Sequence, residues 1–439
     1  MNLLESNKIK KEIEMHKQDF LDDLKKIIRI KSVASSPQTD APFGKGPREA
    51  LDNIVSLAKL YGFRSEIVGN AMAYVHWGPE NIDHVAVVGH LDVVAAGDGW
   101  FYPPFELTED NGFLYGRGIL DNKGPSMTCL YGMKLLKDMG VKPKRPIRLI
   151  FGSNEESGSQ DNPIYLKHQS APSFGFTPDC KFPVVYGERG IVSYEISTNF
   201  SENELKQIEK IEGNQASDHV PDELKVTTSD KVIDIQGKRS PINAPEFGQN
   251  AITYLAKKIK EQNLMQGKMS EYFSWLYDVF HEKHYGEGLE IEFSDEESGK
   301  LIQTPYMLQK RANQLVLSVA IRYPVTVTEQ QITSRIKETL PFNSKLKIIR
   351  SFPSVLHNKE ETNIQKLSNI YGSITGLDSN PVTTTGATYA RVMPNIVAFG
   401  PSFPGQKGIA HRQNEWMKLT DLLKIMEIYM QSIYTLTVE

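Results

Sequence analysis

The sequence predicts an α/β protein whose larger domain has a mixed, mostly parallel sheet flanked by helices and is interrupted by a smaller α+β domain. Two apolar runs, HVAVVGHLDVV and RPIRLIFGS, have the length and valine-rich composition of strands that are covered on both faces. Helical patterns alternate with these runs, which is typical of a parallel sheet between helices. The 439 residues also exceed what one ordinary core accommodates.

In the first part of the chain, three segments are expected to be helices. Apolar residues recur at helical spacing from Ile9 to Ile27, so one N-terminal helix is predicted there. GPREALDNIVSLAKLYGF has Pro47 in its first turn and Gly62 after its end, and NKGPSMTCLYGMKLLKDMG ends at Gly140. The sequence pattern returns to α/β with NIVAFGPS and a final helix after Thr420.

The character of the sequence changes after VVYGERG. GIVSYEIST and KVIDIQGK are predicted strands, and the following segments read as helix, strand, helix and strand. This order indicates an enlarged ferredoxin-like α+β domain over residues 189–381, with a charged and aromatic insert from about Gln262 to Lys310. Residues 1–188 and 382–439 are expected to form the larger domain.

Composition excludes several classes of protein. The net charge of −4 and the 24% of charged residues are ordinary, so neither nucleic acid nor an anionic membrane is expected as a partner. No apolar run approaches the ~18 residues of a membrane span. Two cysteines exclude a disulfide framework and, with no secretory leader at the N-terminus, favour a reducing, cytoplasmic location.

Polar residues follow the predicted strands, where ligands gather in open α/β sheets. His90 and Asp92 in GHLDVV lie two apart, so their side chains point the same way along a strand. They fit a metal ligand and the carboxylate that orients it, although a hydrogen-bonded histidine near a strand end is the simpler alternative. Asp121 in GRGILDNKGP precedes a helix, and taken alone it is a helix cap.

Glu155 and Glu156 in GSNEES are adjacent carboxylates at the end of a strand. Neighbouring side chains of an extended chain project to opposite sides, so the two are expected to differ in role. One binds a cation, and the other reaches the water on that cation. Asp179 in GFTPDCKFP and His411 in GIAHRQNEW complete the set, although a lone histidine in a loop is usually a solvated surface residue.

Together these residues supply two histidines, three ligand carboxylates and one spare carboxylate in one domain. Two divalent ions ~3.5–4 Å apart, bridged by a carboxylate and a water, use such a set completely. Imidazole and carboxylate without thiolate favour zinc, with manganese and cobalt as alternatives.

The motifs GHLDVV, GRGILDNKGP, GSNEES, TPDCKFP and AHRQNEW resemble the dinuclear metallopeptidases that include aminoacylases, glutamate carboxypeptidases and dipeptidases. APFGKGPREALD, AGDGW, YGERGI, AIRYP and GATYAR are most similar to the PepV-type bacterial dipeptidases, so the resemblance spans nearly the whole chain. It implies metal-dependent hydrolysis of dipeptides or other short peptides. It also implies that residues 189–381 are a lid over a catalytic domain.

The resemblance assigns roles position by position. Asp121 is implied to bridge the two metals, with His90 and Asp179 completing one site, and Glu156 and His411 the other. Asp92 is implied to hold the ring of His90, and Glu155 to be the general base and acid. The peptide bond from Asp121 to Asn122 is implied to be cis.

The lid segment GKRSPINAPEFGQNA departs from the family pattern. Pro241 occupies the position of a histidine that meets the oxyanion in the family, and proline has no donor for that role. His219 or Asn243 are possible substitutes. Asp218 replaces an asparagine of the family. Thr385, Gly386 and Ala387 stand where a glycine triplet is usual.

Two arginines match positions that hold the terminal carboxylate of the substrate in the family, namely Arg322 and Arg391, although either is also compatible with a surface ion pair. The segment FSDEESG, Phe293 to Gly299, repeats the look of GSNEES without a preceding buried strand, and is predicted to be a solvated acidic turn.

Three hypotheses follow. The first is a cytoplasmic metal-dependent dipeptidase. The second keeps the site but hydrolyses another amide, such as an N-acyl amino acid. The third, prompted by Pro241, is a weakly active or inactive relative that binds peptides. The insert in the lid is compatible with a monomer.

Overall fold

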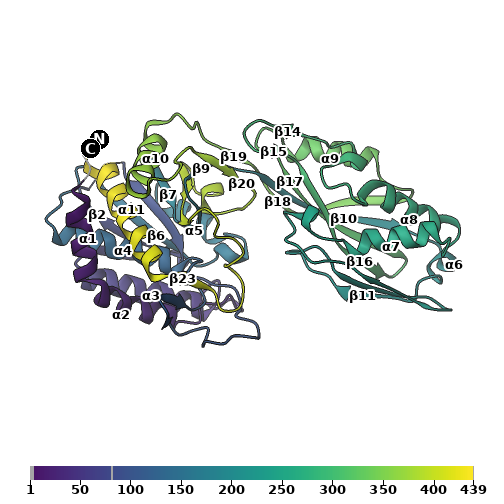
Figure 1. Cartoon of the computed structure of the whole chain (residues 1–439), viewed down its shortest axis with the longest axis horizontal. Helices are drawn as coiled ribbons and strands as arrows, with labels where there is room; N and C mark the ends of the chain where they lie inside the picture. Colours follow the sequence, from purple (N-terminus) through teal and green to yellow (C-terminus); the bar gives the residue numbers. More distant parts are fainter. Residues whose placement is uncertain (1–3, 81–82, 439) are drawn as a thin grey trace. The chain divides into compact units, whose positions relative to one another are not determined.

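The computed structural model describes residues 4–80 and 83–438, which divide into two units (Figure 1). Within the described residues, unit 1 runs to Tyr186 and resumes over His357–Val382 and from Gly386 onward. Unit 2 consists of Gly187–Leu356 with the short piece Thr383–Thr385.

Unit 1 is built on a mixed sheet whose central strands are parallel. Strands β6, β3, β7 and β21 pair in parallel, whereas β1, β2 and β9 at the two sides pair antiparallel. The order across the sheet, with bounds, is β1 (Arg64–Val68), β2 (Met72–Trp77), β6 (Ile147–Gly152), β3 (Val85–His90), β7 (Phe174–Thr177), β21 (Ile396–Phe399) and β9 (Val184–Glu188).

Apolar side chains cover both faces of this sheet, as the two valine-rich runs predict. In β3, Val85 and Val87 belong to the large core, while Ala86 and Val88 face a smaller core on the other side. The flanking helices are α1 (Ser6–Met15), α2 (Lys17–Ile28), α3 (Lys45–Leu60), α4 (Lys123–Asp138), α5 (Asp161–His168), α10 (Thr362–Thr375) and α11 (Leu419–Val438). The single N-terminal helix expected from the sequence is two helices, separated at His16.

The second boundary of the smaller domain differs from the sequence assignment. Residues 357–381 were assigned to that domain, but they lie in unit 1. The reason is the apolar face of α10, where Ile364, Leu367, Ile370 and Tyr371 are buried in the same core as α11. A helix that fits either domain by its periodicity is placed by the core that its apolar side chains join.

Unit 2 contains a four-stranded antiparallel sheet. Its order is β16 (Ile302–Arg311), β17 (Gln314–Tyr323), β10 (Gly190–Asn199) and β18 (Ser344–Phe352), with helices α7 (Ala251–Glu261), α8 (Gly267–Phe280) and α9 (Glu329–Glu338). A separate small sheet contains β11 (Lys210–Asn214), β12 (Glu223–Thr227) and β13 (Val232–Gln236). The remaining short helix is α6 (Glu202–Leu205).

Two details of unit 2 correct the expected α+β pattern. The predicted strand KVIDIQGK is β13, which pairs with β12 in the small sheet and not with β10. The fourth strand of the main sheet, β16, and helix α8 both arise from the segment described as an insert. The acidic turn FSDEESG is formed as predicted, between β14 (Ser294–Asp295) and β15 (Gly299–Lys300).

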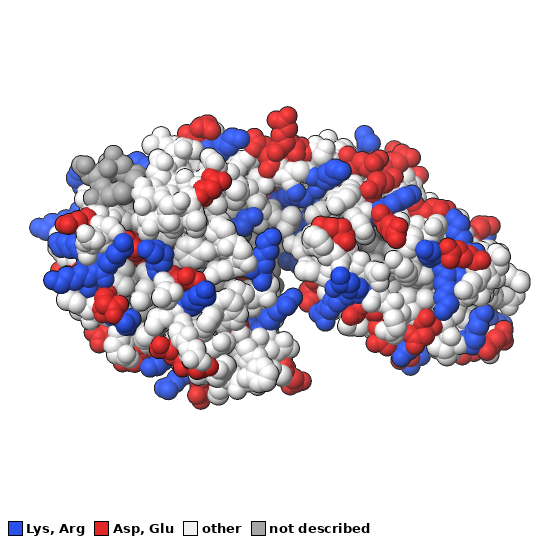
Figure 2. Space-filling model, viewed as in Figure 1, with Lys and Arg blue, Asp and Glu red and all other residues white. Residues whose placement is uncertain are grey.

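Acidic and basic side chains intermingle over the visible surface of each unit (Figure 2). In the part of the chain that the structure describes, no helix has the length and apolar character that crossing a bilayer demands.

Candidate metal centre

The predicted metal ligands of unit 1 follow the carboxyl ends of its parallel strands. His90 is the last residue of β3, and Asp179 lies just beyond the end of β7. Glu156 follows β6, and Asp121 lies two residues before the start of α4. Parallel strands bring their carboxyl ends to one edge of the sheet, so the topology gathers these side chains. His411 joins them from the loop before β23 (Trp416–Lys418).

Asp121 lies between the two histidines. Its Oδ1 is 3.0 Å from Nε2 of His90, and its Oδ2 is 3.0 Å from Nε2 of His411. Each oxygen of one carboxylate therefore faces a different imidazole. This is the arrangement expected of a carboxylate shared between two cations.

The other two ligand carboxylates extend the cluster on either side. His411 Nε2 lies 2.9 Å from Oε2 of Glu156, and His90 Nε2 lies 3.6 Å from Oδ2 of Asp179. Two groups have potential ligand atoms within 4.8 Å of one another, one of His90, Asp121 and Glu156, the other of His90, Glu155 and Asp179. The structure thus brings together all seven residues that the sequence proposed for the centre.

Asp92 has two neighbours in the centre. Nδ1 of His90 is 2.9 Å from the backbone oxygen of Asp92 and 3.5 Å from its carboxylate. The carboxylate accepts the backbone N–H groups of Glu155 at 3.2 Å and of Glu156 at 3.1 Å. Asp92 therefore supports the ring of His90 mainly through its main chain, and its side chain holds the pair of glutamates.

The sequence suggested that the glutamate pair lies in extended chain, but the structure shows otherwise. Strand β6 ends at Gly152, and Glu155–Ser157 form a 3-10 turn. The physical reason is the carboxylate of Asp92, which satisfies two N–H groups at the start of this turn. The two glutamates still differ in their contacts, because Glu156 is bonded to His411 whereas Glu155 groups with Asp179.

Burial and mutual repulsion raise the pKa of three carboxyl groups. Burial, followed by the charge of Asp179, raises the pKa of Glu155 well above its ordinary value. Burial and the charge of Asp121 raise that of Glu156. Burial also raises the pKa of Asp179 to about 7, although His90 opposes this shift. The cluster holds more negative charge than its surroundings compensate.

Hydrogen bonds between histidines and carboxylates favour the charged forms of His411 and Asp121. Burial would lower the pKa of His411, but hydrogen bonds to Asp121 and Glu156 raise it to about 11. Burial would raise the pKa of Asp121, but hydrogen bonds from His411 and His90 hold it below the ordinary range. The histidines therefore act as the cations of the cluster, a role that bound divalent ions can take over.

The donor set fits divalent ions. It offers imidazole nitrogen and carboxylate oxygen at mutual distances suited to shared coordination, with no thiolate among the grouped residues. Four half-buried carboxylates around two imidazoles also need positive charge to remain ionised together.

The residue after Asp121 supports the centre. The peptide bond from Asp121 to Asn122 is cis, as the family resemblance implies. The side chain of Asn122 donates to the backbone oxygen of Pro178 at 2.5 Å, next to Asp179. Its Oδ1 accepts the N–H of His90 at 3.3 Å and the hydroxyl of Ser126 at 2.8 Å.

Buried polar residues that the sequence analysis did not single out surround the centre. Glu415, four residues after His411, is 1% exposed and bonds to the loop before Asp121. Asp161 accepts the N–H groups of Ser153 and Asn154 and the hydroxyl of Tyr389. Glu415 stands in the motif AHRQNEW, but a glutamate in a loop gives no sign in the sequence that it is buried.

The predicted substrate-binding residues are divided between the units. Arg391 belongs to unit 1, where it is 8% exposed and its guanidinium donates to the backbone oxygen of Gly386 at 3.0 Å. Arg322 lies on β17 of unit 2. In the same unit, Asn243 donates to Thr385 at 2.9 Å, so two segments that depart from the family pattern are in contact.

The sequence profile of peptidase family M20/M25/M40 matches residues 86–435. The chain belongs to this peptidase family. As an M20/M25/M40 peptidase it is a metallopeptidase hydrolase, and its class of reaction is hydrolysis of peptides.

Known proteins extend the likeness over almost the entire chain. A Beta-Ala-Xaa dipeptidase of Lactobacillus delbrueckii subsp. lactis is 31% identical, with 97% of each chain covered. Human carnosine dipeptidase 1 has a similar fold, with a TM-score of 0.64 at 15% identity over 99% of this chain and 100% of that one. The dipeptidase Dug1p of Saccharomyces cerevisiae gives 0.62 at 17% identity, with 99% of each covered.

Proposed function

We propose that this M20/M25/M40 peptidase hydrolyses dipeptides or other short peptides with two divalent ions and Glu155 as general base. The observation that carries the proposal is the carboxylate of Asp121, whose two oxygens each lie 3.0 Å from a different histidine. A helix cap or a structural ion pair does not require that arrangement.

The ligands divide into two sets that share Asp121. His90 and Asp179 complete one set, and Glu156 and His411 complete the other. Nitrogen and oxygen donors favour zinc, with manganese or cobalt as alternatives. When bound, the two ions lower the pKa of a water between them and polarise the carbonyl of the scissile bond.

Glu155 is the residue assigned to move the proton. Its backbone is held by Asp92, and burial raises the pKa of its carboxyl group, which suits a group that both accepts and returns a proton. It takes the proton of the attacking water and delivers it to the leaving amine. Asp92 keeps the turn in place, and Glu156 remains a ligand.

Short peptides are the proposed substrates because the 31% identical relative is named a Beta-Ala-Xaa dipeptidase. We assign binding of the substrate's terminal carboxylate to Arg322 and Arg391, since guanidinium matches a carboxylate in shape. Asn243 and His219 are the proposed donors from the lid. In this assignment residues 1–188 and 382–439, together with α10, form the catalytic domain. The remaining residues form the lid.

The proposed setting is the cytoplasm, where the protein acts as a monomer. The chain contains two cysteines, Cys129 and Cys180, too few for a disulfide framework, which suits a reducing compartment.

A second candidate function is hydrolysis of a non-peptide amide such as an N-acyl amino acid, or peptide binding with little turnover. The altered lid motifs favour another amide substrate. Pro241 favours the relative with little turnover, because a proline cannot donate to an oxyanion. The loss of one such donor typically lowers the rate by ~10²–10³.

A panel of dipeptides and N-acyl amino acids, assayed with added zinc, manganese or cobalt, tests the proposal. We expect turnover of dipeptides in a metal-dependent manner. Turnover of the N-acyl compounds alone selects the second function. Bound metal and bound peptide without turnover of either class identify an inactive relative.

A further inference from the structure

Glu415 is the last residue of the loop that carries His411, immediately before β23. Its side chain is 1% exposed and turns inward toward the loop that leads to Asp121. One oxygen, Oε1, accepts three backbone N–H groups, from Gly118 at 3.1 Å, Leu120 at 2.9 Å and Asp121 at 3.1 Å. A single buried oxygen of Glu415 thus holds the backbone of Asp121 and of the loop before it.

The second oxygen of Glu415 is also occupied. Oε2 accepts from Nη1 of Arg117 at 2.7 Å, and Arg117 is itself 1% exposed. The guanidinium donates further to the backbone oxygens of Ala95 and Ala96, and it lies 5.2 Å from the ring of Trp100. Glu415 therefore belongs to a rigid, buried assembly and not to a mobile loop tip.

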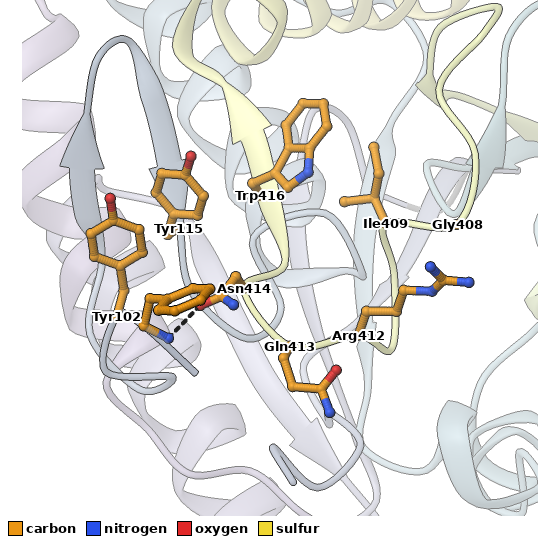
Figure 3. Close-up of a pocket in the computed structure, with 9 residues that line it drawn as sticks. Tyr102, Tyr115, Gly408, Ile409, Arg412, Gln413, Asn414 and Trp416 are labelled. Atoms are coloured by element: carbon orange, nitrogen blue, oxygen red, sulfur yellow. Dashed lines mark hydrogen bonds between the residues drawn. The ribbon is translucent and has the colours of Figure 1, made fainter. Parts of the chain in front are cut away.

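Other residues of the same loop face a cavity (Figure 3). There the loop lines a cavity of about 450 Å³, and Asn414 accepts the N–H of Phe101 at 2.7 Å. After Glu415 the chain pairs with β5 (Phe113–Tyr115), with Trp416 opposite Tyr115. Glu415 is the buried polar side chain that joins the His411 loop to the loop of Asp121.

We propose that Glu415 is a positioning residue of the metal centre, which sets Asp121 and His411 at the correct separation for the cation that they share with Glu156. This inference rests on the proposed dinuclear function. His90 and Asp179 follow the ends of β3 and β7, so the sheet itself positions them. Loss of Glu415 disturbs two ligands of that cation, Asp121 and His411, but only the shared Asp121 of the other cation. It should therefore weaken one of the two cation sites far more than the other.

Loss of a residue that merely stabilises the fold would lower the melting temperature and leave the ratio of the affinities for the two cations unchanged. The test therefore measures metal binding directly, by calorimetric titration of the metal-free full chain with zinc and by metal content after dialysis. Glu415→Ala removes the acceptor, and Glu415→Asp retracts it by one methylene. Glu415→Gln retains an oxygen at the position of Oε1.

For both Glu415→Ala and Glu415→Asp we expect one of the two bound zinc ions to lose at least 10-fold in affinity, with the other changed less than 3-fold. Glu415→Gln should recover most of the lost affinity, because the three N–H groups keep their acceptor. The matched control is Glu427→Gln, since Glu427 is a buried glutamate of α11 that bonds to Ser6 and Lys424. It should bind both ions like the wild type.

Wild-type affinity for both ions in a folded Glu415→Ala protein would overturn the inference, as would an equal loss at both sites. If the alanine variant does not fold, the aspartate variant decides in the same way. A wild-type chain that binds no metal would instead refute the proposed function itself. The two failures are therefore distinguishable.

Discussion

His219 lies opposite Pro241 in an isolated antiparallel bridge of unit 2. The imidazole is 5% exposed, and its Nε2 is buried without a hydrogen-bond partner among the described residues. Its Nδ1 is 2.7 Å from the carboxylate of Asp218. The chain therefore has a histidine beside the proline that replaces the expected oxyanion donor.

Restoring the missing donor should increase turnover. We expect Pro241→His to raise kcat on dipeptides by about 10-fold or more, up to the ~10²–10³ typical of one oxyanion donor. Steady-state kinetics checks this. Pro241→Ala is the control, because it removes the ring without adding a donor, and it should not raise kcat. Equal gains in both variants would show that the proline acts through backbone rigidity.

Removal of Glu155, the proposed general base, should stop turnover while metal remains bound. We expect Glu155→Gln to lower kcat by about 10²–10⁴-fold, the usual contribution of a positioned acid or base. Metal content per chain should stay at the wild-type value. Glu296→Gln, in the look-alike segment FSDEESG, changes an exposed glutamate and should leave kcat unchanged. A Glu155→Gln protein that retained most of its activity would contradict the assigned role.

Metal should stabilise the chain as well as activate it. Repulsion among buried carboxylates is relieved by cations, so zinc at 100 times its dissociation constant should add about 2.7 kcal/mol to the free energy of unfolding. Thermal melts of chelator-treated and metal-loaded protein measure the shift. His411→Ala removes one ligand of the cation that His411 would share with Asp121 and Glu156. This variant should show a smaller metal-induced rise in melting temperature. A melt that is independent of metal would argue against the centre.

The support that Asp92 gives to the glutamate turn is also testable. Asp92→Asn leaves one oxygen where two now accept the N–H groups of Glu155 and Glu156. We expect a loss of about 10–100-fold in activity or metal affinity, as is usual for residues that orient ligands. Asp92→Ala should cost more than Asp92→Asn. Equal effects of both substitutions would show that the backbone oxygen of Asp92, which contacts His90, is what matters.

Acid should destabilise unit 1 through His84, away from the metal centre. Burial, and then the charge of Arg148, lower the pKa of His84 to about 4 from the ordinary 6.5. Below pH 6.5 the unfolded chain binds a proton that the folded one does not, so stability falls as the pH drops toward 4, by about 1 kcal/mol per pH unit. Denaturant unfolding between pH 7 and 4 measures this slope. His84→Gln should flatten it, and an unchanged slope would assign it to other groups.

The fold was largely predictable where burial leaves a mark on composition. The valine-rich run of β3 is covered on both faces, and its alternate residues enter two different cores. The boundary at α10 was not predictable, because an amphipathic helix does not specify which core it will join. Strand β16 was hidden for a similar reason, since its pairing with β17 depends on contacts made only in the folded chain.

The clustering of the candidate metal ligands was predictable because imidazole and carboxylate at the ends of successive strands form a distinctive pattern. The sequence indicated His90 and Asp121, and the structure places them 3.0 Å apart. The 3-10 turn at Glu155 could not be predicted, because the group that holds it, Asp92, is distant in sequence. Glu415 was missed because its three N–H partners lie almost 300 positions earlier in the chain.

The last helix, α11, has a consequence for how the protein is made. It is buried against the core of unit 1, beside residues from the first helices of the chain. During synthesis on the ribosome, unit 2 emerges complete while the earlier half of unit 1 still lacks its closing helix and His411. The nascent chain must therefore hold an unfinished core until α11 has been synthesised, and the candidate metal centre lacks His411 for most of that time.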